Sequence, residues 1–174
     1  MKPRFLFYYG HTLTLNSEET TKAGEEIFDY KAKPLATAFV DDKGRVLTPN
    51  KKNRTNLCSI PKLITVILGF ERWRYQVTAV FHDNVYNKGG LWQYMGTVEQ
   101  YIIQADCEYV FVKFTRSEGD DLLKHMIPAE AEAKFYTGFK KLFWEKYSKW
   151  VTAPAYWAGV RIGGWACWNG GKSK

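Results

Sequence analysis

The stretch RWRYQVTAVFHDNVYNKGG, residues 72–90, carries apolar side chains at positions 73, 77, 80, 81 and 85. This spacing predicts a helix, and the glycines that follow predict its end. His82 and Asp83 stand side by side among the apolar residues of this helix. Burying a polar or charged group without a partner costs several kcal/mol. The fold must therefore bring partners to this pair from elsewhere in the chain.

A candidate partner follows in QADCEY, residues 104–109. Residues 97–114 are rich in apolar side chains and predict a second helix, although VFVKF at 110–114 is equally typical of a strand. If the two helices pack antiparallel, Asp106 approaches His82. A carboxylate on one imidazole nitrogen leaves the other nitrogen basic, as in a general base. The alternative is a buried polar network that only fixes how the helices pack.

The neighbours of this pair have predicted roles as well. Residues four apart on a helix share a face, so Tyr86 is expected beside His82, and Tyr109 is expected to donate a hydroxyl from the second helix. Asp83 points about 100° away from His82. It is then available to a hard cation such as Ca²⁺, which prefers oxygen ligands.

The rest of the chain divides into two parts. Aromatic and β-branched runs at 5–15, 36–40 and 45–49 predict strands. After Pro61, residues 62–70 predict a helix, RSEGDD at 116–121 a loop, and Pro128 the start of an amphipathic helix to residue 150. We therefore expect an α+β fold in one domain, with a small β-rich part (1–54) followed by a mainly helical body (55–174) that contains an antiparallel helix pair.

Composition narrows the function classes without choosing one. The 174 residues are 45% hydrophobic, and 25 Lys and Arg against 18 Asp and Glu give a net charge of +7. This charge is compatible with nucleic acid, anionic lipid or an acidic partner. The basic residues are scattered along the chain, which equally suits a solvated basic face. Cys58, Cys107 and Cys167 fit neither a disulfide framework nor a zinc site, which favours a reducing compartment. No signal peptide and no membrane-spanning stretch is expected.

Four motifs in order resemble phage and prophage proteins of domain-of-unknown-function family 1353. They are TNLCSIP (55–61), HDNVY (82–86), ADCEY (105–109) and YWAGVRIGG (156–164). The resemblance covers about two-thirds of the chain. It implies a phage protein located in the virion or in the host bacterial cytoplasm, with other virion proteins as partners and with oligomers among the expected states.

The pair of motifs HDxxY and ADxxY also resembles the catalytic helix pair of phospholipases A2. That resemblance implies His82 as the base, Asp83 as a Ca²⁺ ligand and Asp106 as the orienting acid. Two departures stand against it. No glycine-rich calcium loop precedes His82, and Asn56 replaces the usual aspartate of the first motif, where Ser59 is a further supporting residue. An amide carries no charge and binds divalent cations weakly, and Asn56 also suits a turn.

Three functions compete on this basis. The first is a structural or assembly component of a virion tail or head, in which the His–Asp pair is not catalytic. The second is a calcium-dependent lipid or ester hydrolase that acts on anionic membrane lipid. The third is a metal phosphohydrolase, which requires His11 and Asp120 or Asp121 on one metal.

Two further features have local interpretations. The tail residues Trp157, Trp165 and Trp168 with Arg161 suit a lipid interface or an aromatic core or oligomer contact. His125, after DDLLK, is interpreted as a structural cation at a helix end.

Overall fold

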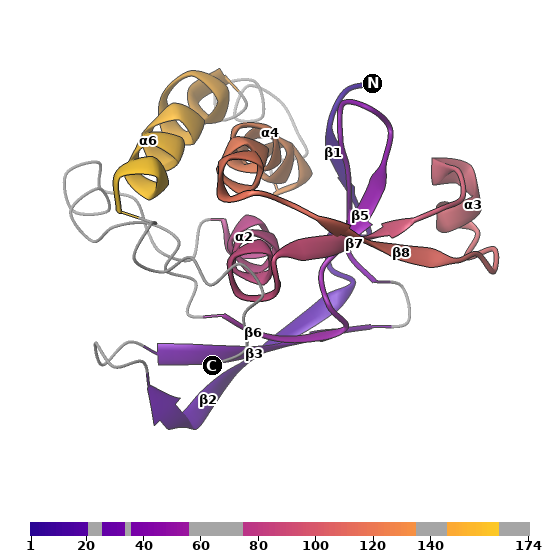
Figure 1. Ribbon diagram of the computed structural model, residues 1–174, viewed down its shortest axis with the longest axis horizontal. Coiled ribbons are helices and arrows are strands. Elements are labelled where there is room, and N and C mark those ends of the chain that lie inside the picture. The colour runs from indigo at the N-terminus through magenta and orange to yellow at the C-terminus, as the bar shows by residue number, and fades with distance from the viewer. Residues whose placement is uncertain (21–25, 34–35, 56–74, 135–145, 164–174) are drawn as a thin grey trace.

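The computed structural model describes residues 1–20, 26–33, 36–55, 75–134 and 146–163 (Figure 1). The strands are β1 (Arg4–Leu6), β2 (His11–Thr20), β3 (Glu26–Ala32), β4 (Ala38–Val40), β5 (Val46–Thr48), β6 (Lys52–Thr55), β7 (Gly90–Tyr94) and β8 (Tyr109–Lys113). The helices are α2 (Gln76–Lys88), α3 (Val98–Ile102), α4 (Arg116–Lys134) and α6 (Ala153–Gly163), and the π-helical segment η1 (Ser148–Thr152) precedes α6. The predicted α+β class is confirmed.

The strands form two antiparallel sheets. One has the order β1-β4-β5-β7-β8, and the other has the order β2-β3-β6. In Figure 1 the five-stranded sheet has α2 and α4 on one side and α3 on the other, while the three-stranded sheet lies beneath α2. Helix α2 is therefore enclosed by the two sheets and by α4. This explains why every residue from Val77 to Tyr86 is buried.

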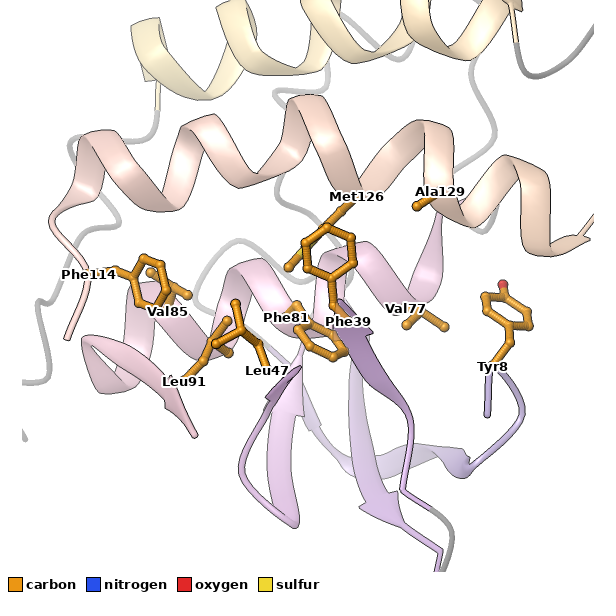
Figure 2. Close-up of a cluster of buried hydrophobic side chains, with 10 residues drawn as sticks. All are labelled: Tyr8, Phe39, Leu47, Val77, Phe81, Val85, Leu91, Phe114, Met126 and Ala129. Carbon is orange, nitrogen blue, oxygen red and sulfur yellow. The ribbon is translucent and has the colours of Figure 1, made fainter. Parts of the chain in front are cut away.

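The main core lies between the five-stranded sheet and the helix pair. Phe39, Leu47 and Leu91 project from three different strands toward Phe81 of α2 and Met126 of α4 (Figure 2). Successive strand residues point to opposite faces, so Ala38, Val40, Val46 and Tyr94 face the other way. There they pack against Val98 and Tyr101 of α3. Because the strands carry apolar side chains on both faces, helices pack on both faces of this sheet.

The predicted helix pair exists, but its second member is α4 and not residues 97–114. Residues 98–102 form the short helix α3, and 109–113 form β8, so the strand interpretation of that segment holds. The predicted loop at 116–121 is wrong, because these residues are the first turns of α4. The predicted helix start at Pro128 is also wrong, since Pro128 lies inside α4. The predicted helix at 62–70 and residues 135–145 lie outside the described residues.

A capping box explains the early start of α4. The Thr115 backbone N–H and hydroxyl both donate to Oε2 of Glu118, at 2.7 Å each. The Glu118 backbone N–H donates in return to the Thr115 hydroxyl at 3.3 Å. Reciprocal bonds of this kind satisfy donors that a helix N-terminus leaves unpaired. His125 consequently lies in the middle of α4, exposed, and the interpretation of a cation at a helix end is wrong.

The close approach of α2 and α4 depends on Gly119. A Cβ atom at this position would lie 2.7 Å from Cγ1 of Val85, which is fully buried. We expect Gly119→Val to lower the free energy of unfolding by about 2 kcal/mol, because extra methyl groups in a packed core force the helices apart. Urea denaturation measures this loss. Combining the change with Val85→Ala should restore part of the stability, and an unchanged midpoint for Gly119→Val would contradict the close contact.

Candidate functional site

His82 projects from α2 toward α4 and is only 3% exposed. Its Nε2 atom lies 3.4 Å from Oδ1 of Asp120, which is itself fully buried in the second turn of α4. The hydroxyl of Tyr86 donates to the same Oδ1 at 2.6 Å. The rings of His82 and Tyr86 lie 4.2 Å apart, as expected for residues one helical turn apart. The carboxylate that contacts His82 is therefore Asp120.

Two arginines neutralise Asp120 from its other side. Nε of Arg116 and Nε of Arg161 each lie 3.7 Å from Oδ2 of Asp120. Arg116 also donates through Nη2 to the carbonyl oxygens of Val160 (2.9 Å) and Arg161 (2.6 Å). Arg161 donates to the Ser117 hydroxyl at 2.6 Å. The Asp120 carboxylate thus joins α2, α4 and α6 in one charged network.

The network holds Asp120 in its ionised form. Burial is the largest single influence and acts to raise the pKa of this carboxyl. The hydrogen bonds from His82 and Tyr86, with the charges of His82 and Arg116, outweigh burial and lower the pKa of Asp120 below its ordinary value. Burial and the bond to Asp120 raise the pKa of Tyr86, against the opposing effect of Arg116. Tyr86 is therefore a neutral donor at physiological pH.

The two residues after His82 are also tied to other elements. The Thr55 hydroxyl of β6 donates to Oδ2 of Asp83. Nδ2 of Asn84 donates to the Gly90 carbonyl at 2.7 Å, and its Oδ1 accepts from the Asn50 backbone N–H at 3.1 Å. Three successive polar residues of α2 therefore contact three different parts of the fold. These contacts explain why α2 can bury three polar side chains in the core.

Asp106 does not lie beside His82 on a helix, and this prediction is wrong. It is an exposed residue of the segment between α3 and β8, and it lines a cleft together with Tyr94, Tyr101 and Tyr109. The helix predicted for 97–114 ends at Ile102, so ADCEY cannot project toward α2 as a helical face. Tyr109 is the first residue of β8, 43% exposed, and is likewise not part of the His82 network.

The remaining predicted residues have separate outcomes. Asn56 and Ser59 lie outside the described residues, as do Cys58, Cys167, Trp165 and Trp168. Cys107 is a free thiol. His11 pairs with the Thr37 hydroxyl at 3.0 Å and stacks on Tyr30, so it is engaged in β2 rather than with Asp120.

Trp157 packs α6 against α4. Its indole N–H donates to Asp121 at 2.9 Å, and the ammonium of Lys124 lies 3.9 Å from the ring centroid. Trp157 is therefore held by partly exposed charged side chains of α4, and its roles at a lipid interface or in an oligomer contact stay predictions. No helix within the described ranges has both the length and the hydropathy needed to cross a bilayer.

Metal ligands are sparse in the part of the chain that the structure describes. No group of three or more His, Cys, Asp or Glu side chains there is placed to hold a metal ion. Ca²⁺ takes six to eight oxygen ligands, and the Asp83 carboxylate already accepts from Thr55. A Ca²⁺ ion at Asp83 stays a prediction.

The arrangement supports two kinds of chemistry. With Asp120 on Nε2, the other ring nitrogen of His82, Nδ1, is buried and has no hydrogen-bond partner among the described residues. Such an imidazole is oriented as a base is, but it lacks an open path to solvent in an enclosed position. The same contacts make a bracing network that holds three helices together.

The comparisons with known proteins add no relative. No model of a protein family, no curated protein and no solved structure matches this chain.

Sequence reasoning named Asp120 only as a metal ligand of the phosphohydrolase alternative, and it missed Arg116 and Glu130. Asp120 lies in RSEGDD, whose Ser, Gly and Asp residues are typical of loops. The capping-box pattern from Thr115 to Glu118 was the available signal that a helix begins there. With that helix, Arg116 and Asp120 fall four apart on one face. No local signal pointed to Glu130.

Proposed function

We propose that this protein is a structural or assembly component of a bacteriophage particle, in its tail or head, and that its His–Asp network is a brace and not a catalytic site. The four motifs that resemble the phage family support the phage assignment. The enclosure of His82 supports the bracing role: its imidazole is 3% exposed and faces Asp120. The Asp120 carboxylate is in turn shared with the Tyr86 hydroxyl and with the arginines that reach from α4 and α6.

A lipid or ester hydrolase is the second candidate. The observation in its favour is the Nδ1 atom of His82, which has no hydrogen-bond partner among the residues described. Asp120 would then hold the orienting position on Nε2 that the sequence assigned to Asp106. Asp83 would have to exchange its bond with Thr55 for a contact to Ca²⁺. Asp120 already contacts Nε2, but His82 is enclosed and Asp83 is bonded to Thr55. Substrate and Ca²⁺ would reach these side chains only if α2 moved, so the bracing role is the better supported of the two.

The catalytic role and the bracing role of His82 predict different results for the purified protein. The wild type and His82→Gln are incubated with phosphatidylglycerol vesicles, with and without Ca²⁺, and released fatty acid is measured by mass spectrometry. We expect no release from either protein and a lower melting temperature for His82→Gln, because a buried hydrogen-bonded group is replaced. Calcium-dependent release by the wild type that a folded His82→Gln protein lacks would establish the hydrolase instead.

The particle assignment has its own test. Phage particles produced by the source strain are purified by density gradient, and the chain is quantified by mass spectrometry in the particles and in the cleared host lysate. We expect enrichment in the particle fraction together with known coat and tail proteins. A chain found only in the lysate, at the level of an abundant cytoplasmic host protein used as a control, would contradict a virion component.

A further inference from the structure

An aromatic strip runs along the face of the five-stranded sheet that is turned away from α2 and α4. Trp92 and Phe111 are cross-strand partners with ring centroids 5.3 Å apart. The next pair on the same face, Tyr94 and Tyr109, has centroids 5.4 Å apart. Leu91 and Val112, which point the other way, pack in the main core.

Two rings of this strip are open to solvent. Trp92 is 37% exposed and Tyr109 is 43% exposed. Partly exposed rings on a sheet present flat apolar surfaces to a ligand. Trp92 and Tyr109 therefore present ring surfaces that the core leaves open, while Tyr94 packs against α3.

The strip leads into a cleft of about 490 Å³, within the usual size range of ligand sites. The hydroxyl of Tyr94 donates to the Ala105 carbonyl at 2.7 Å, and that of Tyr101 donates to the Ala36 carbonyl at 2.8 Å. These bonds fix the cleft walls on both sides. The wall residues Phe7 and Gln104 have φ values of 48° and 56°, a left-handed conformation that is uncommon for residues other than glycine.

Basic residues form a band beside the aromatic cleft. Lys33 and Lys51 line that cleft, while Lys31 and Lys52 line a second cleft of about 540 Å³. The two linings are neighbours in sequence at Lys51 and Lys52, and Lys31 and Lys52 are direct cross-strand partners on the β3–β6 ladder. Like charges directly opposite each other destabilise a sheet. A polyanion that lies along the band would relieve this repulsion.

The band continues beyond the ladder and connects to the strip. Arg54 and Lys88 also line the second cleft. At the other end, the Trp92 indole N–H donates at 2.8 Å to Asn50, the residue before Lys51. Two acidic residues lie among these groups. Asp29 lies 3.6 Å from Arg54, and Asp106 at the aromatic cleft is placed to accept from base amino groups.

We propose that this surface binds single-stranded nucleic acid, with bases stacked on Tyr109 and Trp92 and phosphates along Lys51, Lys52, Lys31 and Lys33. Aromatic side chains beside a positively charged groove are the elements by which proteins hold single strands. A double helix keeps its bases stacked on one another and offers none to Tyr109. The lysines are exposed, so a bilayer surface would meet them too, but its headgroups offer no flat rings to stack on Tyr109 and Trp92. This inference goes beyond the proposed particle role and does not require it.

The test measures fluorescence anisotropy of a labelled polythymidine strand on the full chain at several salt concentrations. Lys51→Ala/Lys52→Ala should weaken binding about tenfold or more and reduce the slope of log affinity against log salt by about 1.4, since each neutralised phosphate of a single strand contributes about 0.7. Tyr109→Ala should weaken binding about tenfold, and Tyr109→Phe should bind as the wild type does, because a phenyl ring still stacks.

Matched controls separate this site from net charge alone. Lys146→Ala/Lys149→Ala removes the same charge from exposed residues near and in η1, and Trp150→Ala removes an exposed ring there. Both should change the affinity less than twofold. Equal weakening by the control pair, absence of strand binding at low salt, or equal affinity for a DNA duplex would each overturn the proposal. So would phosphatidylserine vesicles that bind and displace the strand from Lys51 and Lys52.

Discussion

Replacing Glu130 with alanine is expected to lower the free energy of unfolding by about 3–5 kcal/mol. This carboxylate of α4 is fully buried and accepts from the backbone N–H groups of Val77 (3.2 Å) and Thr78 (2.8 Å) and from the Tyr8 hydroxyl (2.8 Å). The N-cap residue of α2, Tyr75, makes no capping bond through its side chain. Glu130 therefore supplies from α4 the acceptor that the start of α2 needs.

Urea denaturation followed by circular dichroism measures the loss, and Glu132→Ala is the matched control. Glu132 lies on the same helix and forms a salt bridge with Lys2 at 2.8 Å near the surface. A partly exposed pair of this kind contributes about 1 kcal/mol or less. The loss of stability in Glu130→Gln should lie between those of Glu130→Ala and Glu132→Ala. The amide oxygen of the glutamine still accepts a hydrogen bond, but its NH₂ group faces other donors. If Glu130→Ala loses no more stability than Glu132→Ala, the hydrogen bonds from Glu130 to the start of α2 do not stabilise that helix.

The sequence was sufficient for elements whose signal is local. The apolar spacing from Val77 to Val85 predicted α2 because each of these positions faces a hydrophobic neighbour. The β-branched and aromatic runs predicted strands in the first 55 residues for a similar reason. The pairing of β7 with β5, which adds β7 and β8 to strands from the beginning of the chain, was not predictable locally. Their partners are set by register across the five-stranded sheet.

The site was predicted in part. His82 and Tyr86 do share a buried network with a carboxylate from an antiparallel helix. The sequence selected Asp106 because an apolar-rich segment was interpreted as one long helix. In the structure α3 is five residues long and Gln104 adopts a left-handed conformation, so the chain turns away before Asp106. Asp120 was passed over because RSEGDD was interpreted as a loop, whereas in the structure it lies in α4, which packs against α2.

Replacing Asp120 with alanine is expected to cost about 3 kcal/mol of stability, because it leaves two partly buried arginines and the buried Tyr86 hydroxyl without their partner. Arg116 and Arg161 would lose the carboxylate that both approach at 3.7 Å, and the Tyr86 hydroxyl would lose its acceptor at 2.6 Å. Thermal and urea denaturation measure the loss. Asp121→Ala, at the neighbouring half-exposed position, is the control and should cost much less.

The stability lost when the Asp120 carboxylate is removed should also depend on pH. The folded-state pKa of Asp120 lies below its unfolded value, which is near 4. A carboxyl with a lowered pKa contributes stability that is complete above the unfolded pKa and is lost as the pH falls through the folded one. The stability gap between the wild type and Asp120→Asn should thus be present at pH 6 and shrink below about pH 4. A gap that widens on acidification would mean that Asp120 is protonated in the folded protein, and the charged network of α2, α4 and α6 would then be incorrect.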